Sequence, residues 1–229
     1  MANRPVYEAV EQIPFYRQMN IDFQFYSGFS ITQKQKSIES LHTKYCMVSP
    51  KKKILEISSK SPLALGVELS AFNLKIHTKK SVFSVECAFQ GSKVFQNGGP
   101  YKELLSKTSL EAKKYDKLRT SGKLIAFKYY DKEFPLFPRD YFYNWLYINA
   151  LKLNEELSNE ILNFDCFSDI EFNPQKSINC QAKAAAIFVG LSKSGLLQEA
   201  TKSKEDFLRV VYGDNKIKRC EQLFLDLNN

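Results

Sequence analysis

Apolar residues recur at helical spacing in several parts of the chain. The segment 31–42 is polar except for Ile31, Ile38 and Leu41, which is typical of an amphipathic surface helix. The segment 139–162 is apolar on more than one side and predicts a long, largely buried helix. Its expected core contacts are Tyr143, Trp145, Leu146, Ile148 and Leu151.

Two more helices are predicted near the end of the chain. Residues 182–193 form an apolar run that we expect to stop near Gly195, because glycine readily ends a helix. Residues 203–212 predict a last helix. The segment 168–180 is polar, contains a proline and predicts a loop before the helix at 182–193.

Other segments read as extended chain. Residues 1–30 mix aromatic and polar positions, which indicates strand or loop before the first helix. Residues 54–61 are short and β-branched, and residues 65–83 look like two strand-like pieces around Lys79 and Lys80. Residues 123–138 alternate aromatic and polar side chains and end in prolines. We therefore expect a small β-sheet.

The middle of the chain carries the most informative pattern. We predict a helix over residues 84–95, a break at residues 98–100, and a helix over 102–122 that is interrupted around residues 107–109. No repeat or low-complexity linker divides the chain. The prediction is one helix-rich α+β domain over residues 1–229, with residues 1–22 as an N-terminal extension and the 84–95 helix at its centre.

Charge and composition limit the classes of function. The formal net charge is +8, which fits a phosphate-rich partner, although plain solubility is the more common explanation of such a charge. The five cysteines show no CxxC spacing, and there are only two histidines. This predicts neither a disulfide framework, a metal site nor a Ser-His-Asp triad, and we expect no cofactor. Basic residues cluster at Lys51–Lys53, Lys79–Lys80, Lys113–Lys114 and Lys216–Arg219.

The chain has no apolar stretch near the roughly 20 residues of a membrane span, and its start carries charges where a secretory signal would be apolar. We therefore expect a cytoplasmic protein without a membrane partner.

A helix over residues 84–95 would place Glu86, Gln90 and Lys93 on one face, at positions i, i+4 and i+7. A carboxyl group there can move a proton at a leaving base, as glycoside cleavage requires. A desolvated lysine can attack the C1 carbon of a sugar or form a Schiff base with an opened ribose. From spacing alone, a solvated polar face is the more common explanation.

The residues themselves resemble a known family. The string ECAFQGSKVF is similar to the E-H-Y-F-Q-x-x-K-F core motif of the NADAR domain family, with matches at Glu86, Phe89, Gln90 and Lys93. LSAFNL resembles the family's S-N-F element, and QFYSG its aromatic N-terminal motif. Asp169 and Asn179 fall where the family has D-x-x-W-G followed by N-R-L-G. The whole pattern resembles most closely the NADAR antitoxins that accompany DarT-type toxins.

This resemblance implies removal of ADP-ribose from guanine bases in DNA, single-stranded or flipped out of a duplex, and so reversal of modification by the toxin. It implies Glu86 as general acid and base and Lys93 as the group that stabilises or captures the ribose C1. Other expected roles are stacking of a base on Tyr26 or Phe172, a ribose hydroxyl on Asp169, and a diphosphate on backbone amides at Ser177–Asn179. The full set of substrate-binding residues that we expect is Tyr26, Ser27, Gly28, Phe72, Phe89, Gln90, Trp145, Asp169, Phe172, Ser177 and Asn179.

The chain departs from the family pattern at Val85, at Cys87 and in the segment IEFNP. These departures leave the acid, the amide and the amine in place and bear on the shape of the substrate. If the substrate is DNA, its phosphates would be contacted by Lys51–Lys53 or by Lys79–Lys80. Two alternatives stay open: an N-glycosidase for a free nucleotide or riboflavin-pathway metabolite, and a non-catalytic protein that reads ADP-ribose or contacts the toxin directly.

Overall fold

A computed structural model of the chain describes residues 1–213. The predicted basic cluster Lys216–Arg219 and Cys220 lie outside these residues. The strands are β1 (Ala2–Ala9), β2 (Tyr16–Phe23), β3 (Ile54–Glu56), β4 (Lys75–His77), β5 (Val82–Ser84), β6 (Lys93–Phe95), β7 (Leu124–Tyr129), β8 (Lys132–Phe134) and β9 (Cys166–Ser168). The helices are α1 (Ile31–Val48), α2 (Ala64–Glu68), α3 (Val85–Gly91), a 3-10 helix (Lys102–Ser106), α4 (Ser109–Lys113), α5 (Lys117–Thr120), α6 (Tyr141–Lys152), α7 (Glu155–Ile161), α8 (Gln181–Lys193), α9 (Leu197–Ala200) and α10 (Lys204–Tyr212).

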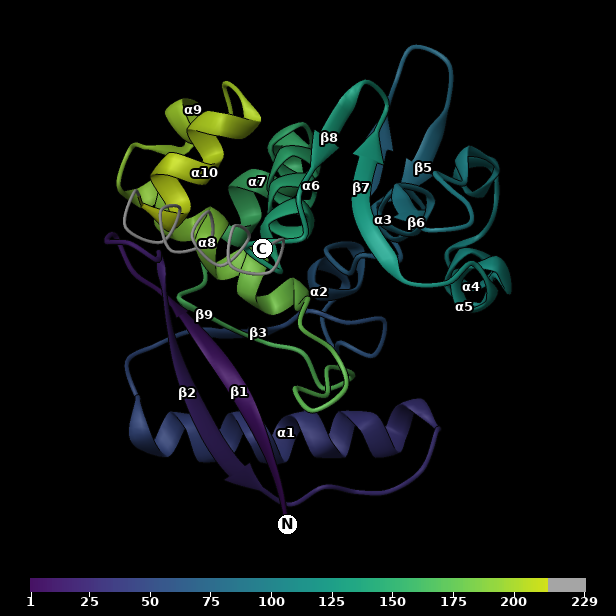
Figure 1. Cartoon of the computed structure of the whole chain (residues 1–229). Helices are drawn as coiled ribbons and strands as arrows, with labels where there is room; N and C mark the ends of the chain where they lie inside the picture. Colours follow the sequence, from purple (N-terminus) through teal and green to yellow (C-terminus); the bar gives the residue numbers. More distant parts are fainter. Residues whose placement is uncertain (214–229) are drawn as a thin grey trace, which may run out of the picture.

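The largest sheet has four strands in the order β2-β1-β9-β3 and lies between α1 and α8 (Figure 1). Side chains alternate between the faces of a strand, and the sequence follows that rule. Val6 and Cys166 pack with α1 residues in one buried cluster, whereas Tyr7 and Phe167 join the main core on the α8 side. The amphipathic character of α1 therefore has a partner, namely the second face of this sheet.

Helix α6 forms the centre of the main core. All of its side chains except Asn149 and Lys152 are buried, as expected for a helix that is apolar all round. Aromatic rings dominate the packing: Phe142 stacks on Phe127 at 4.8 Å, and Trp145 lies 4.9 Å from Phe134. The small sheet β6-β7-β8 covers this side of α6.

The prediction of one helix-rich α+β domain is confirmed, with three small sheets rather than one. The predicted helix at 31–42 exists and continues to Val48, and the helices at 182–193 and 203–212 form within one residue of the expected bounds. Residues 1–22 form β1 and most of β2, so they are part of the largest sheet. The break near residues 107–109 is also present.

Four predicted elements differ from the structure. The helix expected over 102–122 is a 3-10 helix followed by α4 and α5, with a second break between Lys113 and Lys117. The helix expected over 84–95 ends at Gly91, and Lys93 begins β6, because this strand pairs with β7. The helix expected over 139–162 is two helices, separated at residues 153–154, where the Asn154 side chain bonds the Ala150 carbonyl at 2.7 Å. The segment 65–83 includes α2 in addition to the β4–β5 hairpin.

Among residues 1–213, no helix combines the length and the apolar character that crossing a bilayer requires.

Candidate active site

The short helix α3 begins directly after β5 and is held at its first turn by hydrogen bonds. The Ser84 hydroxyl accepts from the Cys87 amide at 3.1 Å, which caps the helix. The Val85 amide donates to the Leu74 carbonyl at 3.0 Å, and the Glu86 amide donates to the Ala71 carbonyl at 2.8 Å. The segment SAFNL, whose resemblance suggested substrate contact, thus fixes the backbone from which Glu86 projects.

Gln181, the first residue of α8, supports that segment. Its side-chain oxygen accepts from the Ala71 amide at 2.7 Å, and its Nε2 donates to the Ile57 carbonyl at 2.7 Å. One side-chain amide therefore joins the start of α8 to Ile57, directly after β3, and to the turn at Ala71 that holds the start of α3. No local pattern around Gln181 indicates this role, because its partners lie more than 100 positions away.

Glu86 and Gln90 form a buried polar pair on α3. Glu86 is 7% exposed and Gln90 8%, and the Gln90 Nε2 donates to the Glu86 Oε1 at 2.9 Å. Within the described part of the chain the Gln90 Oε1 is buried and has no hydrogen-bond partner. A buried acceptor of this kind is costly unless a donor reaches it.

Lys93 lies on β6 but its amine turns back over α3. The Nζ is 5.0 Å from the centre of the Phe89 ring, which is a cation–π distance. Burial lowers the pKa of Lys93, and the nearby Glu86 opposes this shift. The acid, the amide and the amine therefore lie together, although Lys93 reaches this place through a turn and a strand rather than through a third helical turn.

Tyr143 on α6 completes this group. Its ring meets Phe89 edge-on at 5.2 Å. Burial raises the pKa of its phenol well above the usual value, and Glu86, Tyr147, Cys180 and Asp169 raise it further. The hydroxyl thus stays protonated, and no group in residues 1–213 forms a hydrogen bond with it. Sequence analysis assigned Tyr143 to the core only.

Asp169 lies in the loop after β9, and Tyr143 connects it electrostatically to Glu86, because both carboxyls raise the Tyr143 pKa. Its Oδ1 accepts from the amides of Glu171 at 3.0 Å and Phe172 at 3.1 Å, so it caps the turn. Burial and the neighbouring Glu56 raise the pKa of Asp169 well above the usual value.

Glu56 fixes the start of this loop from β3. It accepts from the Ile170 amide at 2.8 Å and from the Ser168 hydroxyl. Since Ser168 gives its proton to Glu56, the His42 Nε2 must donate to Ser168, at 2.8 Å. Burial lowers the pKa of His42 to about 4, so its imidazole is neutral near pH 7. α1 is thereby joined to the Asp169 loop.

Comparison with protein families decides the relationship of this chain. The model of the DarT1-associated NADAR antitoxins matches residues 2–221, nearly the whole sequence. The chain belongs to this family. The resemblance found in the motifs around Glu86 is therefore confirmed. The comparison with curated proteins found no similar sequence.

This NADAR antitoxin brings four of the expected site residues together: Glu86, Phe89, Gln90 and Lys93. Asp169 approaches them through Tyr143, and Phe172 is buried in the same loop. Phe72 lies beside α4, where the Lys113 amine is 5.1 Å from its ring.

The remaining expected residues lie elsewhere or have other partners. Tyr26, Ser27 and Gly28 precede α1, and the Tyr26 amide donates to the Ser37 hydroxyl at 2.9 Å. Backbone amides free to bind a diphosphate were expected at 177–179, but the Ser177 amide donates to the Asn173 carbonyl at 2.9 Å and α8 begins only at Gln181. The amide of Ser177 is therefore already used within its own turn.

Unpartnered polar atoms in the NADAR antitoxin favour the expected binding residues. Within residues 1–213, four buried side-chain nitrogen or oxygen atoms have no hydrogen-bond partner. Three of them belong to residues expected to bind substrate: the Gln90 Oε1, the Trp145 Nε1 and the Asn179 Oδ1. The fourth is the Arg4 Nε. Buried polar atoms normally have partners, so this concentration is consistent with groups that bond a ligand.

Acidic, thiol and imidazole side chains are the usual protein ligands of metal ions. In the part of the chain that the structure describes, no three of them are close enough to hold a metal ion together.

Proposed function

We propose that this antitoxin hydrolyses the bond between ADP-ribose and guanine in DNA and so reverses the modification made by a DarT1-type toxin. The observation that carries the proposal is the buried Glu86–Gln90 pair beside the amine of Lys93, in a chain that belongs to a family of DarT1-associated antitoxins. A protein that only reads ADP-ribose has no use for a desolvated amine next to a carboxyl.

In the proposed reaction, Lys93 acts in its uncharged form, which its lowered pKa makes more accessible. The amine attacks C1 of the ribose attached to guanine. The C1–nitrogen bond breaks, its electron pair stays on the guanine nitrogen, and that nitrogen takes a proton from the Glu86 carboxyl. The new carboxylate accepts the proton released from the lysine nitrogen.

Water then completes the hydrolysis. It adds at C1 while the bond to the Lys93 nitrogen breaks, which releases ADP-ribose and restores the amine. Glu86 moves the protons in both directions, as one carboxyl does in double-displacement glycosidases. Gln90 orients Glu86 through the 2.9 Å hydrogen bond. Its Oε1, which has no partner within residues 1–213, can accept a hydrogen bond from a hydroxyl or amine group of the substrate.

The test is release of ADP-ribose from a single-stranded oligonucleotide that carries one ADP-ribosylated guanine. We compare the wild type with Glu86→Gln and Lys93→Ala, and use Lys132→Ala at the exposed first position of β8 as the matched control. We expect Glu86→Gln to lower the rate about 10²- to 10⁴-fold and the control to match the wild type. The Lys93–ribose adduct becomes a Schiff base when its ribose ring opens, with the ring oxygen taking up a proton, and borohydride reduces that C=N bond. Borohydride added during turnover should therefore trap ADP-ribose on the wild type and not on Lys93→Ala.

Other outcomes separate the alternatives. Tight binding of the oligonucleotide with no release would favour a reader of ADP-ribose. Cleavage of small nucleotide substrates with no cleavage of the oligonucleotide would favour a metabolite N-glycosidase. Release at the wild-type rate by Glu86→Gln would contradict the assigned role of Glu86.

A further inference from the structure

We infer that the outer face of α1, together with the aromatic residues just before it, binds the single-stranded DNA that flanks the modified guanine. We call this surface the α1 face and define it by Tyr26, Phe29, Lys36, Thr43 and Lys44. The inference rests on the proposed function and adds to it a second contact region, separate from the Glu86 site.

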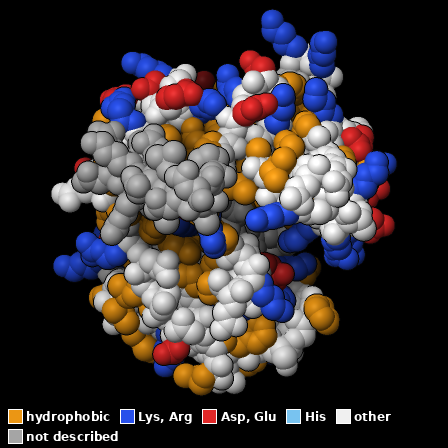
Figure 2. All heavy atoms as spheres, in the orientation of Figure 1, with side chains coloured by type: hydrophobic (Ala, Val, Ile, Leu, Met, Phe, Trp, Pro, Cys, Tyr) orange, Lys and Arg blue, Asp and Glu red, His pale blue; other side chains and the backbone are white. Residues whose placement is uncertain are grey.

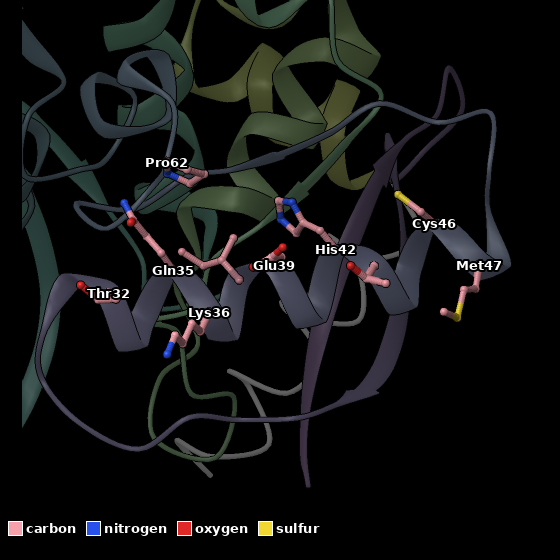
Figure 3. A pocket seen from close by; sticks show the side chains of 10 residues that line it. Thr32, Gln35, Lys36, Glu39, His42, Cys46, Met47 and Pro62 are labelled. Atoms are coloured by element: carbon pink, nitrogen blue, oxygen red, sulfur yellow. The ribbon is translucent and has the colours of Figure 1, made fainter.

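Two adjoining hollows mark the α1 face. One has a volume of about 860 Å³ and lies between α1 and Pro62, with Gln35 and His42 rising from the helix toward that proline (Figure 3). The other, of about 480 Å³, extends from the same helix to Tyr26. Lys36, Glu39, Thr43 and Met47 line both hollows, so they form one continuous groove along the helix.

Two exposed aromatic residues lie near this groove: Tyr26 lines the smaller hollow, and Phe29 lies three positions further along the chain, just before α1. Phe29 is 98% exposed and Tyr26 is 37% exposed, although large aromatic side chains are usually covered. Their backbone is held: the Tyr26 amide bonds the Ser37 hydroxyl, and the Ser30 hydroxyl caps α1 by accepting from the Gln33 amide at 3.3 Å. Rings presented on a fixed backbone are what single-stranded nucleic acids use for base stacking.

Two lysines on α1 supply positive charge along the groove. Lys36 and Lys44 are exposed, and neither forms an ion pair with a carboxylate of residues 1–213. They are eight positions apart, which is roughly 12 Å along a helix. Lys34 differs, because it pairs with Glu171 at 3.0 Å. The single acid of the groove, Glu39, leaves the face with a positive balance that suits phosphates.

The α1 face is structurally continuous with the proposed active site. Lys34 of α1 pairs with Glu171, and the Glu171 amide donates to Asp169 at 3.0 Å. Asp169 and Glu86 both act on the phenol of Tyr143. In Figure 1 the loop after β9 lies next to α1, and in Figure 2 Lys and Arg side chains surround a hollow at the middle right of the same view. A DNA strand on α1 would therefore lie beside the loop that contains Asp169, whose carboxyl acts on Tyr143 together with that of Glu86.

The combination of stacking rings with unpaired lysines favours a nucleic-acid strand over a protein partner. A protein interface of this size normally has an apolar centre with few lysines, whereas lysine and exposed aromatic residues together are typical of single-strand binding. The toxin protein is the competing occupant, and the experiment below distinguishes it.

The experiment compares two substrates, a short single-stranded oligonucleotide with one ADP-ribosylated guanine and the ADP-ribosylated nucleoside alone. The variants are Lys36→Gln/Lys44→Gln and Phe29→Ser. The control is Lys132→Gln/Lys202→Gln, which removes the same charge from exposed positions near β8 and α9, at the opposite end of the molecule (Figure 1). Kinetics are measured over a range of salt concentrations.

We expect the α1 variants to lower kcat/KM for the oligonucleotide about tenfold, through KM, and to leave the nucleoside unaffected. Loss of two phosphate contacts should also reduce the slope of log kcat/KM against log salt by about 1.4, since each contact to single-stranded DNA contributes about 0.7. The control should keep the wild-type slope.

Two results would overturn the inference, and a third would contradict the proposed function instead. Equal kinetics of wild type and α1 variants on the oligonucleotide would overturn it. Equal kinetics combined with a loss of toxin neutralisation in cells would also overturn it and assign the α1 face to the toxin protein. If the wild type cleaves neither substrate, the proposed function itself has failed, and a filter-binding comparison of the same variants on unmodified single-stranded DNA then tests the α1 face by itself.

Discussion

Glu86 and Gln90 lie one turn apart on α3, and the Gln90 amide donates a 2.9 Å hydrogen bond to the Glu86 carboxyl. Both side chains are buried, and the α3 backbone beneath them is fixed by the 70–74 segment. Because the nitrogen of the Gln90 amide makes this bond, its oxygen has no hydrogen-bond partner within residues 1–213. Gln90 thus orients the carboxyl and offers an acceptor at the same time.

Replacing Gln90 with Met should remove both functions while nearly keeping the side-chain length. In the proposed reaction Glu86 becomes a carboxylate when it gives its proton to guanine, and a hydrogen bond to a charged group contributes about 1.5–3 kcal/mol, so we expect kcat/KM for ADP-ribose release to fall about 10- to 100-fold. The exposed Gln198→Met on α9 serves as the control and should keep full activity. A fully active Gln90→Met protein would show that Glu86 needs no such partner.

Lys93 and Lys183 are both largely buried, and we expect opposite effects on stability when each is replaced with Met. Burial lowers the pKa of Lys93, so its charged form destabilises the fold near pH 7. Burial also acts on Lys183, but its ion pair with Asp140 at 2.6 Å prevails and raises its pKa. Breaking a buried pair costs about 3–5 kcal/mol.

Thermal unfolding at pH 7 should therefore show a Tm for Lys93→Met that equals or exceeds the wild-type value, although activity is lost. Lys183→Met should lower Tm by roughly 10 °C, given about 2–4 °C per kcal/mol for a domain of this size. A large drop in Tm for Lys93→Met would mean that its amine stabilises the fold.

Tyr143 and Tyr147 occupy neighbouring turns of α6 and form a second matched pair. The Tyr147 hydroxyl donates to the Leu69 carbonyl at 2.7 Å, whereas the Tyr143 hydroxyl has no such bond within residues 1–213. We expect Tyr143→Phe to keep the wild-type Tm and to lose about tenfold in kcat/KM, because the phenol is available to the substrate. Tyr147→Phe should lose about 1 kcal/mol of stability and retain its kinetics. The reverse pattern would exclude Tyr143 from the site.

Asp169 predicts a defined dependence of stability on pH. Its folded pKa is raised above the unfolded value near 3.8, so the folded state holds a proton that the unfolded state releases. The stability from this group is complete below about pH 4 and is lost as the pH rises through the folded pKa. Asp169→Asn keeps the acceptor for the loop amides and should gain in Tm over the wild type more at pH 8 than at pH 5.

Asp165→Asn is the control of opposite sign. Although burial acts to raise its pKa, hydrogen bonds from the Lys53 amide and Lys193 hold it below the usual value. The contribution of the Asp165 carboxyl to the stability of the fold is therefore present above about pH 4 and is lost as the pH falls through the folded pKa. Asp165→Asn should be less stable than the wild type at pH 8, with a difference that shrinks in acid. Parallel pH curves for both variants would contradict these assignments.

The sequence was most informative where structure depends on near neighbours. The amphipathic spacing in 31–42 predicted α1, and the apolar run before Gly195 predicted α8. The helix that contains Glu86 and Gln90 was predicted for the same reason, since residues four apart on one helix meet whatever surrounds them. The motif around these residues also indicated the family that the full-chain comparison then showed.

Long-range contacts account for the errors. The helical pattern of the sequence continues past Gly91. In the structure, however, the backbone of residues 93–95 pairs with β7, about 30 positions further along the chain, and this pairing ends the helix. The role of Tyr143 was missed because an aromatic residue in an apolar run looks the same whether it faces a core or a site. Gln181 was missed because both of its bonds span more than 100 positions.

The sequence by itself therefore determined the helix-rich α+β class, the family motif and the Glu86–Gln90 pair, because local spacing and residue type are enough for each. Only the tertiary structure decided that Lys93 returns over Phe89 from a strand, that Glu86 and Asp169 both act on the phenol of Tyr143, and that α1 presents lysines and an aromatic residue at the surface of residues 1–213. Those arrangements depend on strand pairing and helix packing between distant segments. Their free energies belong to the assembled core, and no short stretch of sequence contains them.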